Sequence, residues 1–82
     1  MKVQVLFFAS CRDVVGHRER EMTVADGTTV TDLIDTIGEN HPKFRALVPS
    51  LMVSVNQDYV ERTQALSDGD EVAFIPPVSG GR

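Results

Sequence analysis

The chain has 82 residues, a formal net charge of −4 at pH 7 and a hydrophobic fraction of 41%. This length predicts one small domain without room for a deep active-site cavity of its own, and the acidic charge argues against nucleic acid as the main partner. Cys11 has no second cysteine to pair with, no zinc-type cluster is present, and no apolar run approaches the ~20 residues that cross a membrane. We therefore expect a domain that folds without a metal or a bound cofactor. The first residues resemble a strand rather than a secretory leader, which predicts a soluble, cytoplasmic protein.

Two strands are predicted before the first helical pattern. Over residues 2–7, Val3, Val5 and Phe7 occupy every second position, which is typical of a strand with one face on a core. A polar connection is expected over residues 10–16. A weaker, edge-like strand follows over residues 18–24 and pairs with the first strand as a hairpin.

The clearest predicted element is an amphipathic helix that begins after Thr29. Thr29 and Asp32 have the spacing of an N-cap residue and a capping-box acid, and Pro42 excludes continuation of the helix. Asp32, Asp35 and Glu39 share one side of this helix and are interpreted as its solvated face rather than as a metal or acid–base set. The apolar stripe has the i, i+3, i+4, i+7 spacing of one helix face and consists of Val30, Leu33, Ile34 and Ile37.

Short strands follow the helix, over residues 51–55, 59–60 and 71–75, with turn sequences between them. One main helix covers only one face of a mixed sheet, so this order predicts an α+β fold of the β-grasp, or ubiquitin-like, type. The first and last strands are then parallel neighbours at the centre of the sheet. We expect residues 1–75 to form this domain and residues 76–82 to form a flexible tail.

Strand alternation predicts an apolar patch on the sheet face that the helix leaves uncovered. If Val3, Val5 and Phe7 face the helix, their neighbours on the strand face the other way. A contiguous apolar patch of this kind marks a binding surface, unless loops cover it. The predicted partner-binding residues are Leu6, Phe8, Tyr59, Ala73 and Ile75.

The end of the chain is its most informative segment. Glycine has no Cβ and forms the thinnest possible peptide, so a Gly-Gly end is suited to entering a narrow cleft and presenting a carboxyl group. The two prolines lack N–H donors, which ends the preceding strand and projects the tail outward. A frayed terminus is the simpler interpretation. The predicted partner contacts continue through Pro76, Pro77, Val78 and Ser79, the reactive end is Gly80 and Gly81, and Arg82 follows.

No other residues form a catalytic constellation. Cys11 is a candidate nucleophile or sulfur donor, but a reactive thiol needs a nearby cation or helix N-terminus, and a structural role is favoured. His17 and His41 have no triad or metal-ligand spacing and are interpreted as loop residues.

Several segments of the chain closely resemble the small-subunit family of molybdopterin synthase (MoaD). Arg12 and Val15-Gly16 also fit this family, and the resemblance spans essentially the whole chain. Its most specific part is the tail together with the strand before it. The matching segments are Val5-Leu6-Phe7-Phe8-Ala9, Val55-Asn56-Gln57 and Asp68-Gly69-Asp70-Glu71-Val72-Ala73-Phe74-Ile75-Pro76-Pro77-Val78-Ser79-Gly80-Gly81.

The resemblance implies a sulfur carrier in molybdenum cofactor biosynthesis. An E1-like activating enzyme would use ATP to adenylate Gly81, and sulfur would then replace AMP to give a thiocarboxylate. The tail would enter the large synthase subunit and donate sulfur to cyclic pyranopterin monophosphate. Phe8, Tyr59 and Ile75 match the family's contact surface. The chain would not be catalytic alone, because the large subunit, in a heterotetramer, supplies the catalytic side chains.

One residue departs from the family pattern. The family ends at Gly-Gly, whereas this chain continues to Arg82, which holds the Gly81 carboxyl in an amide bond. Arg82 is either a processing remnant or a cloning addition. A ubiquitin-like protein modifier and a thiamine-type sulfur carrier are the alternative functions, and both need Arg82 to be removed.

Overall fold

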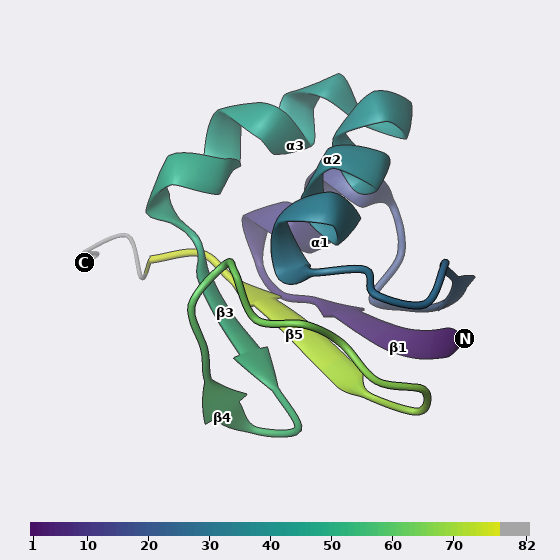
Figure 1. Cartoon of the computed structure of the whole chain (residues 1–82). Coiled ribbons are helices and arrows are strands. Elements are labelled where there is room, and N and C mark those ends of the chain that lie inside the picture. The colour runs from purple at the N-terminus through teal and green to yellow at the C-terminus, as the bar shows by residue number, and fades with distance from the viewer. Residues whose placement is uncertain (78–82) are drawn as a thin grey trace.

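Residues 1–77 are described by the computed structural model, and the predicted flexibility of the tail from residue 78 onward lies outside them. The predicted strands agree with the observed ones to within one residue at each end. Figure 1 shows the arrangement of the elements. In chain order they are β1 (Lys2–Phe7), α1 (Ser10–Val15), β2 (Glu19–Thr23), α2 (Val30–Asn40), α3 (Pro42–Leu47), the 3-10 helix η1 (Val48–Ser50), β3 (Met52–Val55), β4 (Asp58–Tyr59) and β5 (Glu71–Ile75).

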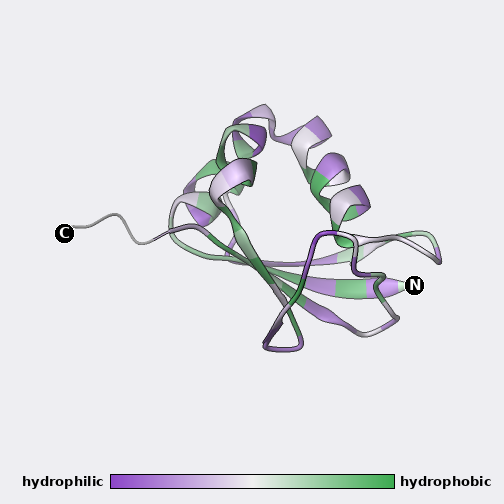
Figure 2. Ribbon diagram, turned by 60° about the vertical axis from the view of Figure 1, so that its left-hand side comes forward, coloured by the Kyte–Doolittle hydropathy of each residue, from purple (hydrophilic) through white to green (hydrophobic). Residues whose placement is uncertain are grey.

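The sheet has five strands in the order β2-β1-β5-β3-β4. β1 and β5 are parallel neighbours, and the other pairs are antiparallel. The α-helices lie together on one side of the sheet (Figure 1), with hydrophobic residues toward it and hydrophilic residues outward (Figure 2). This one-sided cover, with the first and last strands side by side, confirms the predicted α+β, β-grasp arrangement.

The capping prediction for α2 is confirmed. The backbone N–H of Asp32 donates to Oγ1 of Thr29 at 3.2 Å, and the N–H of Thr29 donates to Oδ2 of Asp32 at 3.1 Å. Two of the N–H groups that a helix leaves without intrahelical acceptors are therefore satisfied reciprocally. Asp32 has a structural role at this site.

Two short α-helices and the 3-10 helix η1 were missed by the sequence interpretation. The polar connection predicted over residues 10–16 is wrong, because residues Ser10–Val15 form α1 and bury Cys11 and Val15 one turn apart. Pro42 does end α2, but it also starts α3, since the first turn of a helix tolerates a residue without an N–H. α3 inserts Phe44 into the core.

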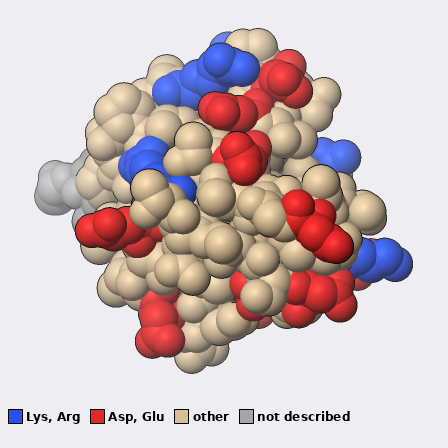
Figure 3. Space-filling view, viewed as in Figure 1, with Lys and Arg blue, Asp and Glu red and all other residues tan. Residues whose placement is uncertain are grey.

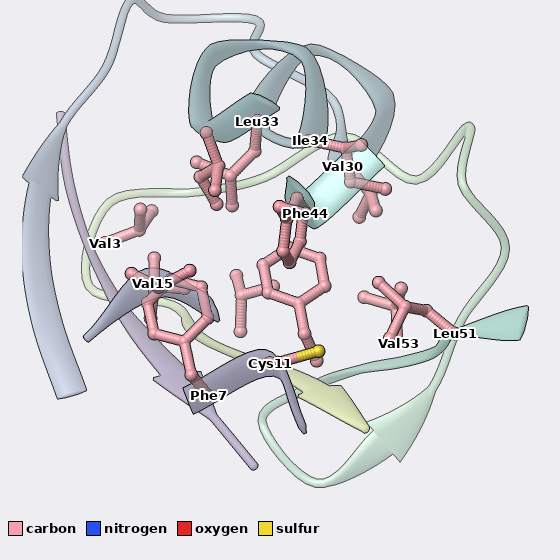
Figure 4. Close-up of a cluster of buried hydrophobic side chains, with 14 of the residues drawn as sticks. Val3, Phe7, Cys11, Val15, Val30, Leu33, Ile34, Phe44, Leu51 and Val53 are labelled. Carbon is pink, nitrogen blue, oxygen red and sulfur yellow. The ribbon is translucent and has the colours of Figure 1, made fainter. Parts of the chain in front are cut away.

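Three phenylalanines fill the centre of the core between the sheet and the helices. The rings of Phe7 and Phe74, from the paired strands β1 and β5, stack with centroids 6.0 Å apart. Phe44 meets both rings edge-on, at 6.2 Å from Phe7 and 5.4 Å from Phe74. Figure 4 shows Phe7 and Phe44 in this cluster together with Cys11 and Leu33. The predicted inward facing of Phe7 is confirmed.

Two turns hold non-glycine residues at positive φ. Asn56 and Gln57, at φ 51° and 74°, join β3 to β4 as a two-residue hairpin loop, the conformation of a type I′ turn. Ala9 lies at φ 48° and ψ −122° between β1 and α1. Because the N–H of Cys11 donates to the carbonyl of Phe8 at 3.0 Å, residues 8–11 form a II′-like turn.

The start of β5 is fixed by hydrogen bonds from the β3–β4 hairpin and the preceding turn. Asn56 Nδ2 donates to Oδ1 of Asp70 at 2.9 Å, and the N–H of Glu71 donates to Oδ1 of Asn56 at 3.0 Å. The N–H of Ser67 donates to Oδ2 of Asp70 at 2.7 Å. These contacts set the register of β5, the strand that leads into the tail.

Within residues 1–77, no helix combines the length and the apolarity needed to cross a bilayer.

Candidate functional site

The sheet face opposite the helices is called the open face here, and two rows of side chains cross it near the end of β5. The strand registers define both rows. Phe8 continues the line of β1, and its N–H donates to the carbonyl oxygen of Phe74 at 3.3 Å. The first row is Leu6, Ala73, Ser54 and Tyr59. The second row is Phe8, Ile75 and Met52.

Three large hydrophobic side chains of the open face are exposed. Phe8 is 44% exposed, Met52 51% and Tyr59 66%, and these are the exposed large hydrophobic residues of the described part of the chain. Leu6 and Ile75 are half-buried between them. Loops therefore leave much of the face accessible, and the structure brings together the residues that alternation assigned to it.

Two of the predicted contact residues are less accessible than expected. Ala73 lies on the open face but is only 6% exposed, because its small methyl group sits on the central strand between Leu6 and Ser54. Pro76 is buried and Pro77 is exposed. The other predicted residues, Val78, Ser79, Gly80 and Gly81, lie outside the described residues.

Met52 is a member of the face that the sequence interpretation missed. It pairs directly with Ile75, the last residue of β5 and the nearest strand residue to the tail. The signal was present in the alternation of β3, since Val53 and Val55 are buried and Met52 lies on the opposite side.

Cys11 is buried in the core, where desolvation raises the pKa of its thiol from 9.0 to about 11. The thiol is therefore protonated at neutral pH and is not an activated nucleophile. This supports the structural role favoured for Cys11.

The polar candidates are not gathered into a site. His17 is exposed beyond α1, and His41 occupies the N-cap position of α3 without a side-chain hydrogen bond to the helix. Asp35 and Glu39 are exposed on α2, as expected for a solvated face. In residues 1–77, no group of acidic, His or Cys side chains is arranged to hold a metal ion. Figure 3 shows acidic and basic side chains interspersed over the face in view, without a broad basic area there.

A mixed sheet of this order with helices on one face places the protein among the ubiquitin-like β-grasp proteins. Residues 5–81 match the family model described as the ThiS family. The chain belongs to this family.

Individual proteins are similar over nearly the whole chain. The molybdopterin synthase sulfur carrier subunit of Chlamydomonas reinhardtii is 41% identical over 83 residues, covering 99% of this chain and 100% of that protein. The protein of the same name from Mycobacterium tuberculosis is 39% identical, with 99% of each chain covered. Among solved structures, SAMP1 (small archaeal modifier protein 1) from Haloferax volcanii superposes with a TM-score of 0.88 at 29% identity, covering 99% of this chain and 100% of that one.

Proposed function

We propose that this chain is the sulfur carrier subunit of a molybdopterin synthase. The observation that carries the proposal is the continuity between the open face and the tail. β5 contributes Ala73 and Ile75 to that face, and the same strand leads through Pro76 and Pro77 to the Gly-Gly sequence. A partner that binds the face therefore contacts the strand from which the tail sequence continues. Full-length similarity to the carrier subunits of two organisms supports the same function.

The tail chemistry follows from the electrophilicity of a carboxyl group. A carboxylate at Gly81 is a poor electrophile, so an E1-like enzyme first joins it to AMP with release of pyrophosphate from ATP. A sulfur nucleophile then attacks the acyl carbon, AMP leaves, and a thiocarboxylate remains. Gly80 and Gly81 carry no side chains and suit a narrow cleft. ATP is the substrate of the activating enzyme, and the carrier itself binds no cofactor.

The large synthase subunit is the proposed partner for transfer. It binds the open face through Phe8, Met52 and Tyr59, receives the thiocarboxylate, and supplies the side chains that pass sulfur to cyclic pyranopterin monophosphate. Because the Cys11 thiol is buried and protonated, we assign sulfur delivery to the thiocarboxylate of the tail and not to Cys11. A heterotetramer of two small and two large subunits is the proposed assembly.

The experiment uses the chain ending at Gly81, incubated with an activating enzyme, ATP and a sulfur source. The expected result is a mass increase equal to replacement of one oxygen by sulfur, followed by molybdopterin formation when the large subunit and cyclic pyranopterin monophosphate are added. A thiocarboxylate that forms but never yields molybdopterin would point to a different pathway, such as a thiamine-type carrier. No thiocarboxylate at all would refute the carrier function.

A protein modifier is the second candidate, because the SAMP1 structure is similar over the full length of both chains. This function would join the Gly81 carboxyl to lysine side chains of other proteins. Mass spectrometry of tagged carrier recovered from cells distinguishes the two, since a modifier is found joined through Gly81 to lysines of other proteins, where trypsin leaves the branch of residues 63–81 that follows Arg62, and a sulfur carrier is not.

A further inference from the structure

A hollow of about 220 Å³ lies at the rim of the open face, beside the short strand β4. Met52 and Tyr59 belong both to its wall and to the open face, so the hollow and the two rows form one continuous surface. The hollow is lined by Leu51, Met52, Val53, Tyr59, Val60 and Arg62.

Arg62 is the cation in this hollow, and the backbone holds it there. Its Nη2 donates to the carbonyl oxygens of Val48 at 2.6 Å and Leu51 at 2.9 Å. No ion pair among residues 1–77 includes Arg62. A guanidinium has five N–H donors, and in the described part of the chain only those of Nη2 have protein acceptors. Arg62 is half-buried. Its two hydrogen bonds fix the guanidinium in position and leave other N–H groups able to donate.

The chemistry of the hollow selects its occupant. A planar guanidinium pairs with a carboxylate through charge-assisted hydrogen bonds, which are the stronger kind. The walls of Met52 and Tyr59 suit the methylene groups that carry such a carboxylate. Docking on the open face would also remove water from around the pair, which strengthens the attraction between the charges.

We propose that the Arg62 hollow receives an aspartate or glutamate side chain of the large synthase subunit. The inference rests on the proposed function, and it adds a charged anchor at the rim of an otherwise apolar interface. Arg62 thus fixes the lateral position of the domain on its partner, while the apolar rows provide the contact area.

A charge-sign test at Met52 examines the proposal without disturbing Arg62. Met52 is 51% exposed, so Met52→Lys and Met52→Glu both fold, and both lose the same apolar contact. The lysine adds a second cation for the partner's acid. The glutamate pairs with Arg62 and repels that acid. We expect the lysine variant to bind the large subunit about tenfold or more tighter than the glutamate variant at low salt, with the difference shrinking at high salt.

Dissociation constants are measured by calorimetry with the purified large subunit. Arg62→Gln keeps an amide that can donate to the Val48 or Leu51 carbonyl but removes the charge, and it should weaken binding by about tenfold or more. Arg45→Gln is the matched control, because it removes an exposed cation from α3, in the helix layer, and its binding should be unchanged.

Equal affinities of the two Met52 variants, or tighter binding of the glutamate variant, would overturn the proposal. If Arg62→Gln does not fold, the Met52 pair decides alone. Failure of the proposed function has a different signature, since the unsubstituted chain would then neither bind the large subunit nor support molybdopterin formation. A bound and active unsubstituted chain with no charge preference at Met52 refutes only the role of the hollow.

Discussion

Replacing the adjacent residues Phe7 and Phe8 by alanine should separate folding from binding. Phe7 is 1% exposed and packs against the rings of Phe74 and Phe44. Phe7→Ala should therefore lower the free energy of unfolding by about 3–5 kcal/mol. A domain of this size has a total stability of about 4–12 kcal/mol, so the variant retains little of it. The melting temperature should fall by about 12–40 °C.

Phe8→Ala should have the opposite profile. Its side chain is 44% exposed on the open face, so its truncation should change the free energy of unfolding by less than about 1 kcal/mol. Binding to the large subunit should weaken by more than about 1–2 kcal/mol, because aromatic anchors carry much of the energy of an interface.

Urea denaturation followed by circular dichroism measures the stability of both variants, and calorimetry measures their binding. Tyr59→Ala and Ile75→Ala should weaken binding to the large subunit in the same way as Phe8→Ala. If Phe8→Ala unfolded the domain while Phe7→Ala bound poorly with its stability intact, the facing of β1 would be inverted and the argument refuted.

Three further predictions concern the hairpin, the core thiol and the end of the chain. Gln57→Gly should raise the free energy of unfolding by up to about 1 kcal/mol in urea titrations, because it relieves a positive φ; a loss of stability would contradict the type I′ assignment. Cys11 should resist thiol reagents at pH 8 until urea is added, and its contribution to stability should be lost as pH rises from 9.0 to about 11, since the unfolded thiol ionises first; rapid labelling of the folded chain would show that the thiol is accessible. Removing Arg82 should switch on ATP–pyrophosphate exchange and thiocarboxylate formation, because displacing the reacting carbon by even 1 Å can cost about a hundredfold in rate. Equal activity of the 82-residue chain, with Arg82 still present by mass, would contradict this.

The elements that the sequence predicted well are those whose local signals agree with their tertiary environment. β5 was predicted with its observed bounds, Glu71–Ile75, because a turn precedes it and prolines follow it. The start of α2 was correct because Thr29 and Asp32 form a cap through contacts only three residues apart. Such signals need no knowledge of the rest of the fold.

The features that were not predicted are either short helices or contacts between segments distant in sequence. α1 and α3 have six residues each, too few for a helical period to stand out from a polar loop. The burial of Ala73 depends on which strands flank β5, and the hollow at Arg62 depends on carbonyl groups 14 and 11 residues away. Neither the burial of Ala73 nor the hollow can be predicted from the residues next to it in sequence. The position of Met52 on the open face could have been predicted by applying the strand alternation to β3 as well.

The position of β5 between β1 and β3 also constrains when the domain can fold during synthesis. The central strand consists of Glu71–Ile75, so the pairing with β1 that closes the sheet joins segments about 70 residues apart and waits until β5 has left the ribosome. A product that stops before Glu71 lacks the centre of its sheet and cannot present the open face. A chain that stops before Glu71 therefore cannot act as an inert competitor at the open face, and every domain that closes its sheet contains the strand from which the Gly-Gly sequence follows.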